Sequence, residues 1–347
     1  MLYIRADGNP EIGTGHLMRC LSIADAVKKR GGTATFIIAD ELVEAMLSER
    51  GYSVVCLYSE WNNLETEIEK MVSLIETHSV DRLLIDSYFV TPEYLQRLRE
   101  LTYVIYIDDL DAFHYPCDML INYNCYADKF DYPARYPGPS LLLGCQYAPL
   151  REEFSDLPIR VPAKDVKSVL VTTGGIDPFR AAEKIVRNAK TSLDLKHLIF
   201  HVVAGRFNPN IEELTRLESE FDGVFLHWNI QKISQLMLDC DIAVSAGGST
   251  LYELCACGTP TVTFALADNQ LNGVNGFGEG YMINARDIRE NEESCLSRVL
   301  DGVSQLILNH DLRCDYSEKG QNLVDGKGAV RLAEAIGSLQ EKTNTHQ

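Results

Sequence analysis

No stretch of the sequence approaches the roughly 20 consecutive apolar residues that a membrane-spanning helix needs. The first residues, 1–5, also lack the basic segment and apolar core of a secretory signal, and are typical of a first β-strand instead. We therefore expect a cytoplasmic protein with no membrane partner.

Patterns that bind metals are missing as well. The ten cysteines include no CxxC pair, and Cys255 and Cys257 lie in a helical pattern without histidine partners. The cysteines are scattered through apolar segments of a long chain, which is more typical of reduced core residues than of a disulfide framework. We expect no metal site and no cofactor.

Positive charge is scarce. The chain has 32 Lys and Arg against 50 Asp and Glu, which gives a formal net charge of −18. Nucleic acids and anionic membranes repel such a protein, so neither is an expected partner. An anionic ligand such as a diphosphate would have to be held by a few basic side chains or by local dipoles, and a helix N-terminus supplies such a dipole.

The length of 347 residues suggests two domains. Short apolar runs alternate with helix-period segments, which predicts βαβ units and parallel sheets covered by helices on both faces. The strands expected in the first half are Leu2–Ala6, Thr33–Ile38, Ser53–Leu57, Arg82–Asp86, Tyr103–Ile107 and Met119–Asn122. The strands expected in the second half are Ser168–Thr172, Leu198–Val203, Val224–Leu226, Ile242–Ser245 and Thr261–Thr263.

The segment Asp156–Asp165 has two prolines and mixed charge, and is the best candidate for a linker. We expect an α/β protein of two Rossmann-like parallel-sheet domains that face each other across a cleft. The first covers 1–157 and the second 166–325, while 326–347 contains an amphipathic helix that can pack back on the first domain. Ligands of such sheets bind beyond the carboxyl ends of strands, at a switch point in strand order.

One glycine-rich turn, Gly13-Thr-Gly-His-Leu-Met18, follows the first strand and opens a helix. Glycines let backbone amides approach a ligand there, and the helix N-terminus favours negative charge. The dinucleotide fingerprint GxGxxG is not completed, because its third position is Met18. His16 has two interpretations: a surface or capping histidine, or a general base that accepts a proton from water.

A second turn, Gly247-Gly-Ser-Thr250, joins the strand Ile242–Ser245 to a helix. Ser249 or Thr250 can cap that helix, whose first amides would point at an anion. Glu253, one turn later, either completes a capping box or accepts hydrogen bonds from ribose hydroxyls. Asn269 and Gln270 end a later strand and suit sugar hydroxyls or N-acetyl groups, or they are ordinary helix-start residues.

Several motifs resemble known proteins. Residues 245–270 resemble the nucleotide-sugar site of the glycosyltransferase-B superfamily. The motifs Arg5-Ala-Asp-Gly8, Gly13–Cys20, Ile85–Tyr88, Ile107–Leu110, Leu143-Gly144, Tyr147–Arg151, Thr172–Pro178 and Val324–Ala329 together resemble the UDP-2,4-diacetamido-2,4,6-trideoxy-β-L-altropyranose hydrolases of pseudaminic acid (nonulosonate) biosynthesis. The resemblance covers nearly the whole chain.

This resemblance implies a glycosyltransferase-B fold and an enzyme that hydrolyses a UDP-sugar. We expect no need for a metal, because the sequence has no cluster of ligands and a helix N-terminus can take the place of a cation. The sequence does not fix the oligomeric state, for which a monomer is the expectation. His16 would activate the water that attacks C1 with inversion, and Tyr88 would help to position the sugar. Glu253 would bind the ribose. The expected substrate-binding residues are Gly13, Gly15, Arg19, Asn122, Arg151, Gly174, Gly175, Asp177, Gly247, Gly248, Ser249, Thr250, Glu253, Asn269 and Gln270.

Three other functions fit parts of this pattern. A glycosyltransferase of the same fold would transfer the sugar to a carbohydrate or lipid acceptor, although a lipid acceptor suits a more basic surface. A hydrolysing sugar-nucleotide epimerase shares the architecture but not the His16 turn. A non-catalytic sensor would keep the turn at Gly247 and have no need of His16.

Overall fold

The structure, a computed structural model, describes residues 1–206, 208–230 and 232–339, and the chain divides into two compact units. Unit 1 consists of Met1–Arg151 and the C-terminal segment that begins at Lys327, while unit 2 is Glu152–Gly326. The chain therefore enters unit 2 a few residues before the segment Asp156–Asp165, for which the sequence predicts a linker.

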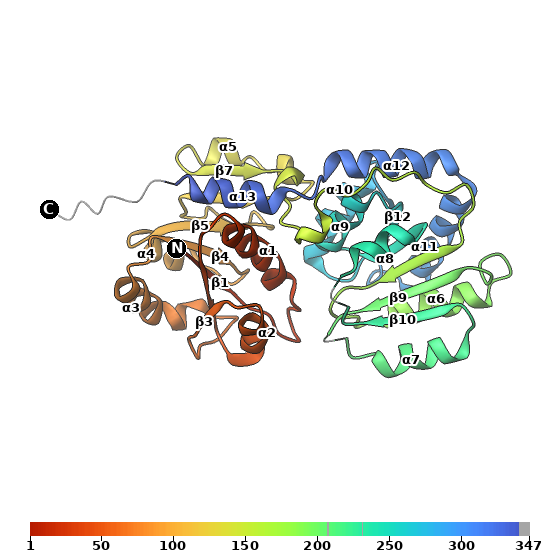
Figure 1. The fold of residues 1–347 in the computed structure, drawn as a ribbon, viewed down its shortest axis with the longest axis horizontal. Coiled ribbons are helices and arrows are strands. Elements are labelled where there is room, and N and C mark those ends of the chain that lie inside the picture. Colours follow the sequence, from red (N-terminus) through yellow and green to blue (C-terminus); the bar gives the residue numbers. More distant parts are fainter. Residues whose placement is uncertain (207, 231, 340–347) are drawn as a thin grey trace. The chain divides into compact units, whose positions relative to one another are not determined.

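Unit 1 is built on a seven-stranded parallel sheet with helices on its faces (Figure 1). The strand order is β3-β2-β1-β4-β5-β6-β7, so the order reverses between β1 and β4. The elements are β1 (Leu2–Ala6), α1 (Gly15–Lys29), β2 (Ala34–Ile38), α2 (Glu44–Glu49), β3 (Ser53–Cys56), α3 (Ile68–His78), β4 (Arg82–Asp86), α4 (Pro92–Arg99), β5 (Tyr103–Ile107), β6 (Met119–Asn122), α5 (Tyr132–Arg135), β7 (Ser140–Leu143) and α13 (Gly328–Gly337). The strands β1, β4, β5 and β6 are almost wholly buried, as their continuous apolar runs predict.

Unit 2 contains a six-stranded parallel sheet in the order β10-β9-β8-β11-β12-β13, which reverses between β8 and β11. Its elements are β8 (Ser168–Thr172), α6 (Ala181–Thr191), β9 (Ile199–Ala204), α7 (Ile211–Glu220), β10 (Val224–Trp228), α8 (Ser234–Asp239), β11 (Ile242–Ala246), α9 (Thr250–Cys257), β12 (Thr261–Ala265), α10 (Leu271–Gly278), β13 (Ile283–Asp287), α11 (Glu292–Leu308) and α12 (His310–Leu323). A buried core joins this sheet to the helices α6, α7 and α11.

The prediction of two Rossmann-like parallel-sheet domains is confirmed, and all eleven predicted strands lie within two residues of their expected ends. Two strands were missed, β7 and β13, and both are edge strands. The residues of β13, Ile283–Asp287, include Asn, Arg and Asp and form no apolar run. Polar residues at a sheet edge are a common protection against aggregation, and they remove the signal by which a strand is recognised.

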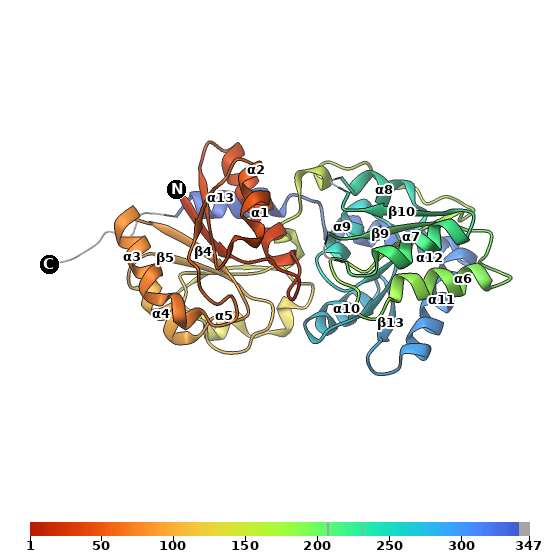
Figure 2. The ribbon, with the colours of Figure 1, turned by 90° about the horizontal axis from the view of Figure 1, so that it is seen from below.

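The helix α13 packs on α1 of unit 1, as Figures 1 and 2 both show. Ala329 and Ala333 lie against Ala26 in a small apolar cluster. Two glycines precede this contact: a Cβ on Gly326 would overlap the backbone of Phe154, and one on Gly328 would overlap that of residues 147–148. The motif Asp325-Gly-Lys-Gly328 is thus explained by close backbone packing.

No described helix is both long and apolar enough to cross a membrane. The ten cysteines all lie within the described residues, and no disulfide joins any two of them.

Candidate active site

The turn between β1 and α1 is held by its own backbone. Asn9 and Gly13 exchange two backbone hydrogen bonds of 3.1 and 2.8 Å, and the Asn9 side chain accepts from the amides of Glu11 and Ile12. Gly13 has a φ of +71°, which favours glycine. A Cβ on Gly15 would meet nothing within 4 Å, so the start of α1 is open. This turn fixes His16 in the first turn of α1.

His16 is paired with Asp86, the last residue of β4. Its Nδ1 lies 2.6 Å from Asp86 Oδ1, and the two side chains are 11% and 0% exposed. Burial by itself would raise the pKa of Asp86, but Arg19 and His16 outweigh it and hold that pKa below the ordinary value of 3.8. Because Asp86 is ionised, the short contact requires the proton on Nδ1, which leaves the Nε2 lone pair as the acceptor of the neutral ring. Among the described residues, Nε2 makes no hydrogen bond.

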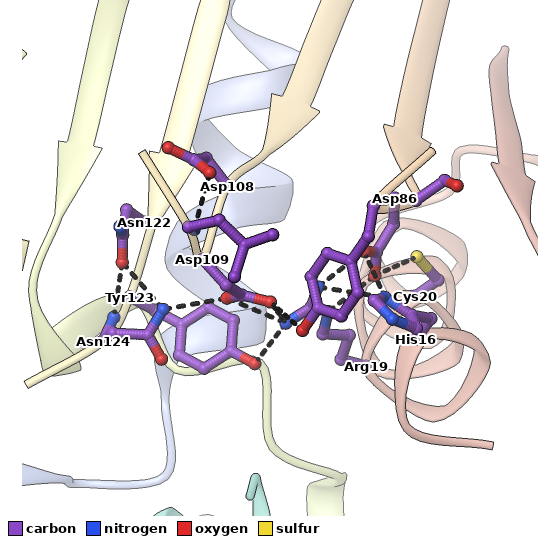
Figure 3. A network of polar contacts seen from close by, with 12 residues as sticks. His16, Arg19, Cys20, Asp86, Asp108, Asp109, Asn122, Tyr123 and Asn124 are labelled. Carbon is purple, nitrogen blue, oxygen red and sulfur yellow. Dashed lines mark hydrogen bonds and ion pairs between the residues drawn. The ribbon is translucent and has the colours of Figure 1, made fainter. Parts of the chain in front are cut away.

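Arg19, one turn further along α1, joins two carboxylates (Figure 3). Its Nε and Nη2 donate to the two oxygens of Asp86 at 2.6 and 2.5 Å. Its Nη1 donates to Asp109 Oδ2 at 2.8 Å and to the Tyr123 hydroxyl at 2.7 Å. The guanidinium is 7% exposed and engaged through all three nitrogens. Arg19 thus links Asp86, at the end of β4, to Asp109, just beyond β5, and its role in substrate binding stays a prediction.

Tyr88 follows β4 and lies beside His16. The two rings meet edge to face, with centroids 4.5 Å apart. The Tyr88 hydroxyl donates to Asp109 Oδ2 at 2.8 Å. Burial, followed by the negative charge of Asp109, raises the pKa of Tyr88 well above its ordinary value of 10.0. Tyr88 therefore keeps its proton and packs against the imidazole, and its role in positioning the sugar stays a prediction.

The site-residue prediction omitted two residues that hold this arrangement together, Asp86 and Asp109. Both lie in motifs noted for their resemblance, and both stand at or just beyond the carboxyl end of a central strand, β4 or β5. This position could have identified both residues as part of the site, because polar side chains at the carboxyl ends of neighbouring parallel strands lie close together. The spacing between His16 and Asp86, 70 residues, hides their pairing from any local pattern.

Asn122 and Arg151, two predicted substrate-binding residues of unit 1, differ in burial and in position. Asn122, at the end of β6, is fully buried; it donates to the Tyr132 hydroxyl and accepts from Asn124. Its side chain is therefore engaged by the protein. Arg151 is half-buried and is the last residue of the first segment of unit 1.

In unit 2, the predicted nucleotide turn lies between β11 and α9, at the switch point of the sheet. A Cβ on Gly247 would come within 2.8 Å of Gln270 Cβ and Val274 Cγ2, so this turn packs directly on the next one. Gly248 has a φ of +135° and open space around it. Ser249 occupies the N-cap position of α9 but makes no capping hydrogen bond, so the expected side-chain cap is absent there.

The residues predicted beside this turn lie on neighbouring strand ends. Gly174, with a φ of +79°, and Gly175 follow β8, and Gly175 is in close contact with Gly205. Asp177 accepts hydrogen bonds from the amides of Ala181 and Ala182, so its carboxylate caps α6.

Gln270 and Asn269 follow β12. Gln270 accepts from the amide of Leu266 at 2.8 Å, which closes the loop after that strand. Asn269 is exposed. Glu253 is half-buried in the first turn of α9. The structure thus brings the predicted residues of unit 2 to the carboxyl ends of its strands. In unit 1 it does the same for Gly13, Gly15, His16, Arg19, Tyr88 and Asn122, while Arg151 lies eight residues beyond the last strand, β7.

Chemically, unit 1 presents a histidine oriented by a buried carboxylate, which is the arrangement of a general base. Unit 2 presents the N-terminus of α9 behind a glycine turn, where backbone amides favour an anion. Within residues 1–206, 208–230 and 232–339, no group of three or more His, Cys, Asp or Glu side chains is placed to hold a metal ion.

Comparison with solved structures identifies the fold class of the chain. The chain superposes on MurG of Acinetobacter baumannii with a TM-score of 0.65 at 11% identity, covering 97% of this chain and 99% of that one. It superposes equally well, with a TM-score of 0.65 at 11% identity, on the MnaA–UDP co-structure from S. aureus, covering 96% and 95% of the two chains. With the two parallel sheets, these similarities confirm the glycosyltransferase-B fold.

Two curated relatives are more specific. The chain is 24% identical over 351 aligned positions to the spore coat polysaccharide biosynthesis protein SpsG of Bacillus subtilis, covering 98% of each. It is 26% identical over 256 positions to the UDP-2,4-diacetamido-2,4,6-trideoxy-beta-L-altropyranose hydrolase of Campylobacter jejuni, covering 72% of this chain and 85% of that protein. These relatives confirm the resemblance drawn from the sequence motifs. No protein-family model matches the chain.

Proposed function

We propose that this protein hydrolyses a UDP-linked diacetamido-trideoxyhexose to the free sugar and UDP, in pseudaminic acid biosynthesis. One observation carries the proposal: His16 Nδ1 lies 2.6 Å from the buried, ionised Asp86, so Nε2 is left as a proton acceptor. The Campylobacter relative, which is named as a hydrolase of such a sugar nucleotide, supports the choice of substrate.

In the proposed reaction, His16 Nε2 removes a proton from water while the water oxygen attacks C1 of the sugar. The bond between C1 and the β-phosphate oxygen breaks, and its electron pair leaves with UDP. Attack from the face opposite the leaving group inverts C1. Asp86 stabilises the imidazolium that forms, and Tyr88 keeps the ring in place through its edge contact.

UDP needs charge stabilisation more than protonation, because a diphosphate is already a good leaving group. We assign this role to the backbone amides around Gly248 and to the N-terminus of α9. Glu253, in the first turn of the same helix, is assigned to the ribose hydroxyls. In this scheme the protein needs no divalent cation.

The test is to incubate the purified full chain with UDP-2,4-diacetamido-2,4,6-trideoxyhexoses, without any acceptor, and to measure UDP release and the anomeric configuration of the product. We expect release with inversion, unchanged by excess chelator. Release that requires a carbohydrate or lipid acceptor would identify a glycosyltransferase instead. Loss of turnover in chelator that magnesium or manganese restores would contradict the metal-independent scheme.

A further inference from the structure

A second buried carboxylate, Asp109, lies close to His16. Asp109 follows β5, the strand next to β4, and its side chain is 7% exposed. Both of its oxygens accept from Arg19 Nη1, at 3.1 and 2.8 Å, and Oδ2 also accepts from the Tyr88 hydroxyl at 2.8 Å. The reaction proposed above gives this carboxylate no role.

Two short routes of contact lead from Asp109 to the imidazole. On the first, Arg19 touches Asp109 through Nη1, while its Nη2 lies 3.1 Å from His16 Nδ1 (Figure 3). On the second, Tyr88 donates to Asp109 through its hydroxyl, and its ring centroid is 4.5 Å from that of His16. A single side chain therefore separates Asp109 from His16 on either route, which is close enough for its charge to act on the ring.

The charges of this cluster do not balance. One guanidinium, Arg19, faces two carboxylates, Asp86 and Asp109, so one negative charge is uncompensated. Without Asp109, Arg19 would cancel Asp86, and the positive N-terminus of α1 would further disfavour a charged imidazole on His16. The four side chains are at most 11% exposed, so water and salt screen these charges little.

The other titratable groups near the imidazole do not alter this balance. Burial raises the pKa of Cys20, Tyr88 and Tyr123 above their ordinary values, so these groups are uncharged near neutral pH. Asp7, after β1, shares the wall of a small recess with the imidazole and is paired with Arg5 at 2.5 Å. This pair is the same in all the variants described below and cancels from the comparison.

We propose that Asp109 sets the proton affinity of His16: its charge offsets that of Arg19 and leaves Asp86 free to stabilise the imidazolium. The inference rests on the proposed function, in which His16 takes a proton from water. Asp109 is a positioning residue in this scheme, because it acts on the imidazole by its charge and through Arg19 and Tyr88, and does not contact the sugar.

Three variants change the charge around His16 in a defined order. In Asp109→Asn no negative charge is left uncompensated, and the titration midpoint of the His16 resonance should fall by about one pH unit. In Arg19→Gln two carboxylates are uncompensated, and the midpoint should rise. The double variant Arg19→Gln/Asp109→Asn has the wild-type net charge, so its midpoint should return to the wild-type value although the contacts of Arg19 are lost.

NMR titration of the imidazole signals in the purified full chain measures these midpoints. The chain has eight histidines, and the signal of His16 is the one that disappears in His16→Asn. Asp128→Asn removes an exposed carboxylate of unit 1 and should leave the midpoint unchanged. Tyr123→Phe removes a neutral acceptor that lies 2.7 Å from Arg19 Nη1, and should leave it unchanged as well.

The proposal is wrong if Tyr123→Phe moves the midpoint as far as Asp109→Asn does, because the geometry of Arg19 would then decide it. It is equally wrong if the double variant keeps the midpoint of Asp109→Asn. Should Asp109→Asn fail to fold with a guanidinium that has lost one buried partner, Arg19→Gln and the double variant differ by the same charge. Equal midpoints in those two would overturn the proposal.

The pH dependence of UDP-sugar hydrolysis separates this inference from the proposed function. The rising limb of kcat should move with the midpoint in each variant, and the plateau of Asp109→Asn should fall several-fold, because a weaker base accepts the proton less readily. Midpoints that follow the charge in a protein that hydrolyses no UDP-sugar would refute the proposed function alone. Hydrolysis by the wild type, with an unchanged midpoint in Asp109→Asn, would refute the inference alone.

Discussion

At the scale of single residues, a buried carboxylate orients the imidazole of His16. Asp86 is fully buried, yet two donors from Arg19 and one from His16 keep it ionised. Arg19 is in turn balanced by Asp109. The histidine is thus oriented by a network that extends over three elements, α1, β4 and the end of β5, and the rigidity of those elements is passed on to the imidazole.

Substitutions of His16 distinguish its two interpretations, a general base and a surface or capping histidine. If His16 is the base, His16→Ala should lower kcat by roughly 10²–10⁴-fold, the usual contribution of one positioned base. His16→Asn should be nearly as slow, because an amide cannot accept the proton. UDP affinity, measured by calorimetry, should stay the same in both variants. A folded variant with kcat within a few-fold of the wild type would exclude the mechanism.

Asp86→Asn should lower kcat by a similar factor, since the amide no longer fixes the proton on Nδ1. It should also change the response to acid. The folded pKa of Asp86 lies below 3.8, so the unfolded chain takes up the proton first as the pH falls. The stabilisation by Asp86 is therefore complete above the unfolded value and is lost as the pH falls through the folded one.

Urea unfolding of wild type and Asp86→Asn between pH 7 and pH 2 measures this contribution. The two free energies of unfolding should differ most at neutral pH and converge in acid. A difference that is constant with pH would show that Asp86 is not the titrating group.

Glu253→Ala tests the nucleotide site. Loss of hydrogen bonds from ribose hydroxyls to a carboxylate should weaken UDP binding by about 1.5–3 kcal/mol. Glu290→Ala, at an exposed carboxylate outside the predicted site, removes the same charge and should leave the affinity unchanged. Equal UDP affinity in the two variants, measured by calorimetry, would mean that Glu253 only stabilises the start of α9 and does not bind the ribose.

At the scale of elements, the turn after β11 depends on close packing. A Cβ at position 247 would stand 2.8 Å from Gln270 Cβ and Val274 Cγ2, so Gly247→Ala must push the turn away from the start of α10. Overpacking of this kind costs about 1–3 kcal/mol. We expect that loss in the free energy of unfolding together with weaker UDP binding. Gly337→Ala, at the end of α13 where an added Cβ meets nothing within 4 Å, should leave the UDP affinity at the wild-type level and should not lower the free energy of unfolding.

Most of the fold could be predicted from the sequence, because buried parallel strands form continuous apolar runs that end in glycine or polar residues. The edge strand β13 could not, because its residues Ile283–Asp287 form no apolar run, and β7, at the other sheet's edge, was missed although it contains the short apolar run Leu141–Leu143. The two glycine turns were found because strand-to-helix turns are local. The pairing of His16 with Asp86 was not, because it depends on which strands become neighbours.

Residue roles were harder to predict than positions. The sequence correctly predicts that Asp177 and Arg19 lie near the carboxyl ends of the strands in their sheets. Only the structure shows that the carboxylate of Asp177 caps α6 and that Arg19 donates hydrogen bonds to Asp86 and Asp109. A polar residue at a strand end can either stabilise the fold or bind a ligand. Which of these roles it has depends on contacts with residues that are distant in the sequence.

At the scale of the whole molecule, an acidic protein is proposed to bind an acidic ligand. The net charge of −18 repels UDP at long range, while amides at a helix N-terminus attract it only at contact. Salt screens the first effect over about 8 Å at physiological ionic strength and leaves short, partly buried hydrogen bonds almost untouched. UDP affinity should therefore stay constant or rise as the salt concentration increases.

Calorimetric titration of the full chain with UDP at about 20 mM and 300 mM NaCl, on either side of physiological ionic strength, measures this dependence. If lysine and arginine side chains held the diphosphate, the affinity would fall with salt, because attraction between exposed charges is screened. A dissociation constant that stays level or decreases would support the helix N-terminus as the main anion site. A several-fold increase would assign the diphosphate to basic side chains and reject the role given to the amides around Gly248.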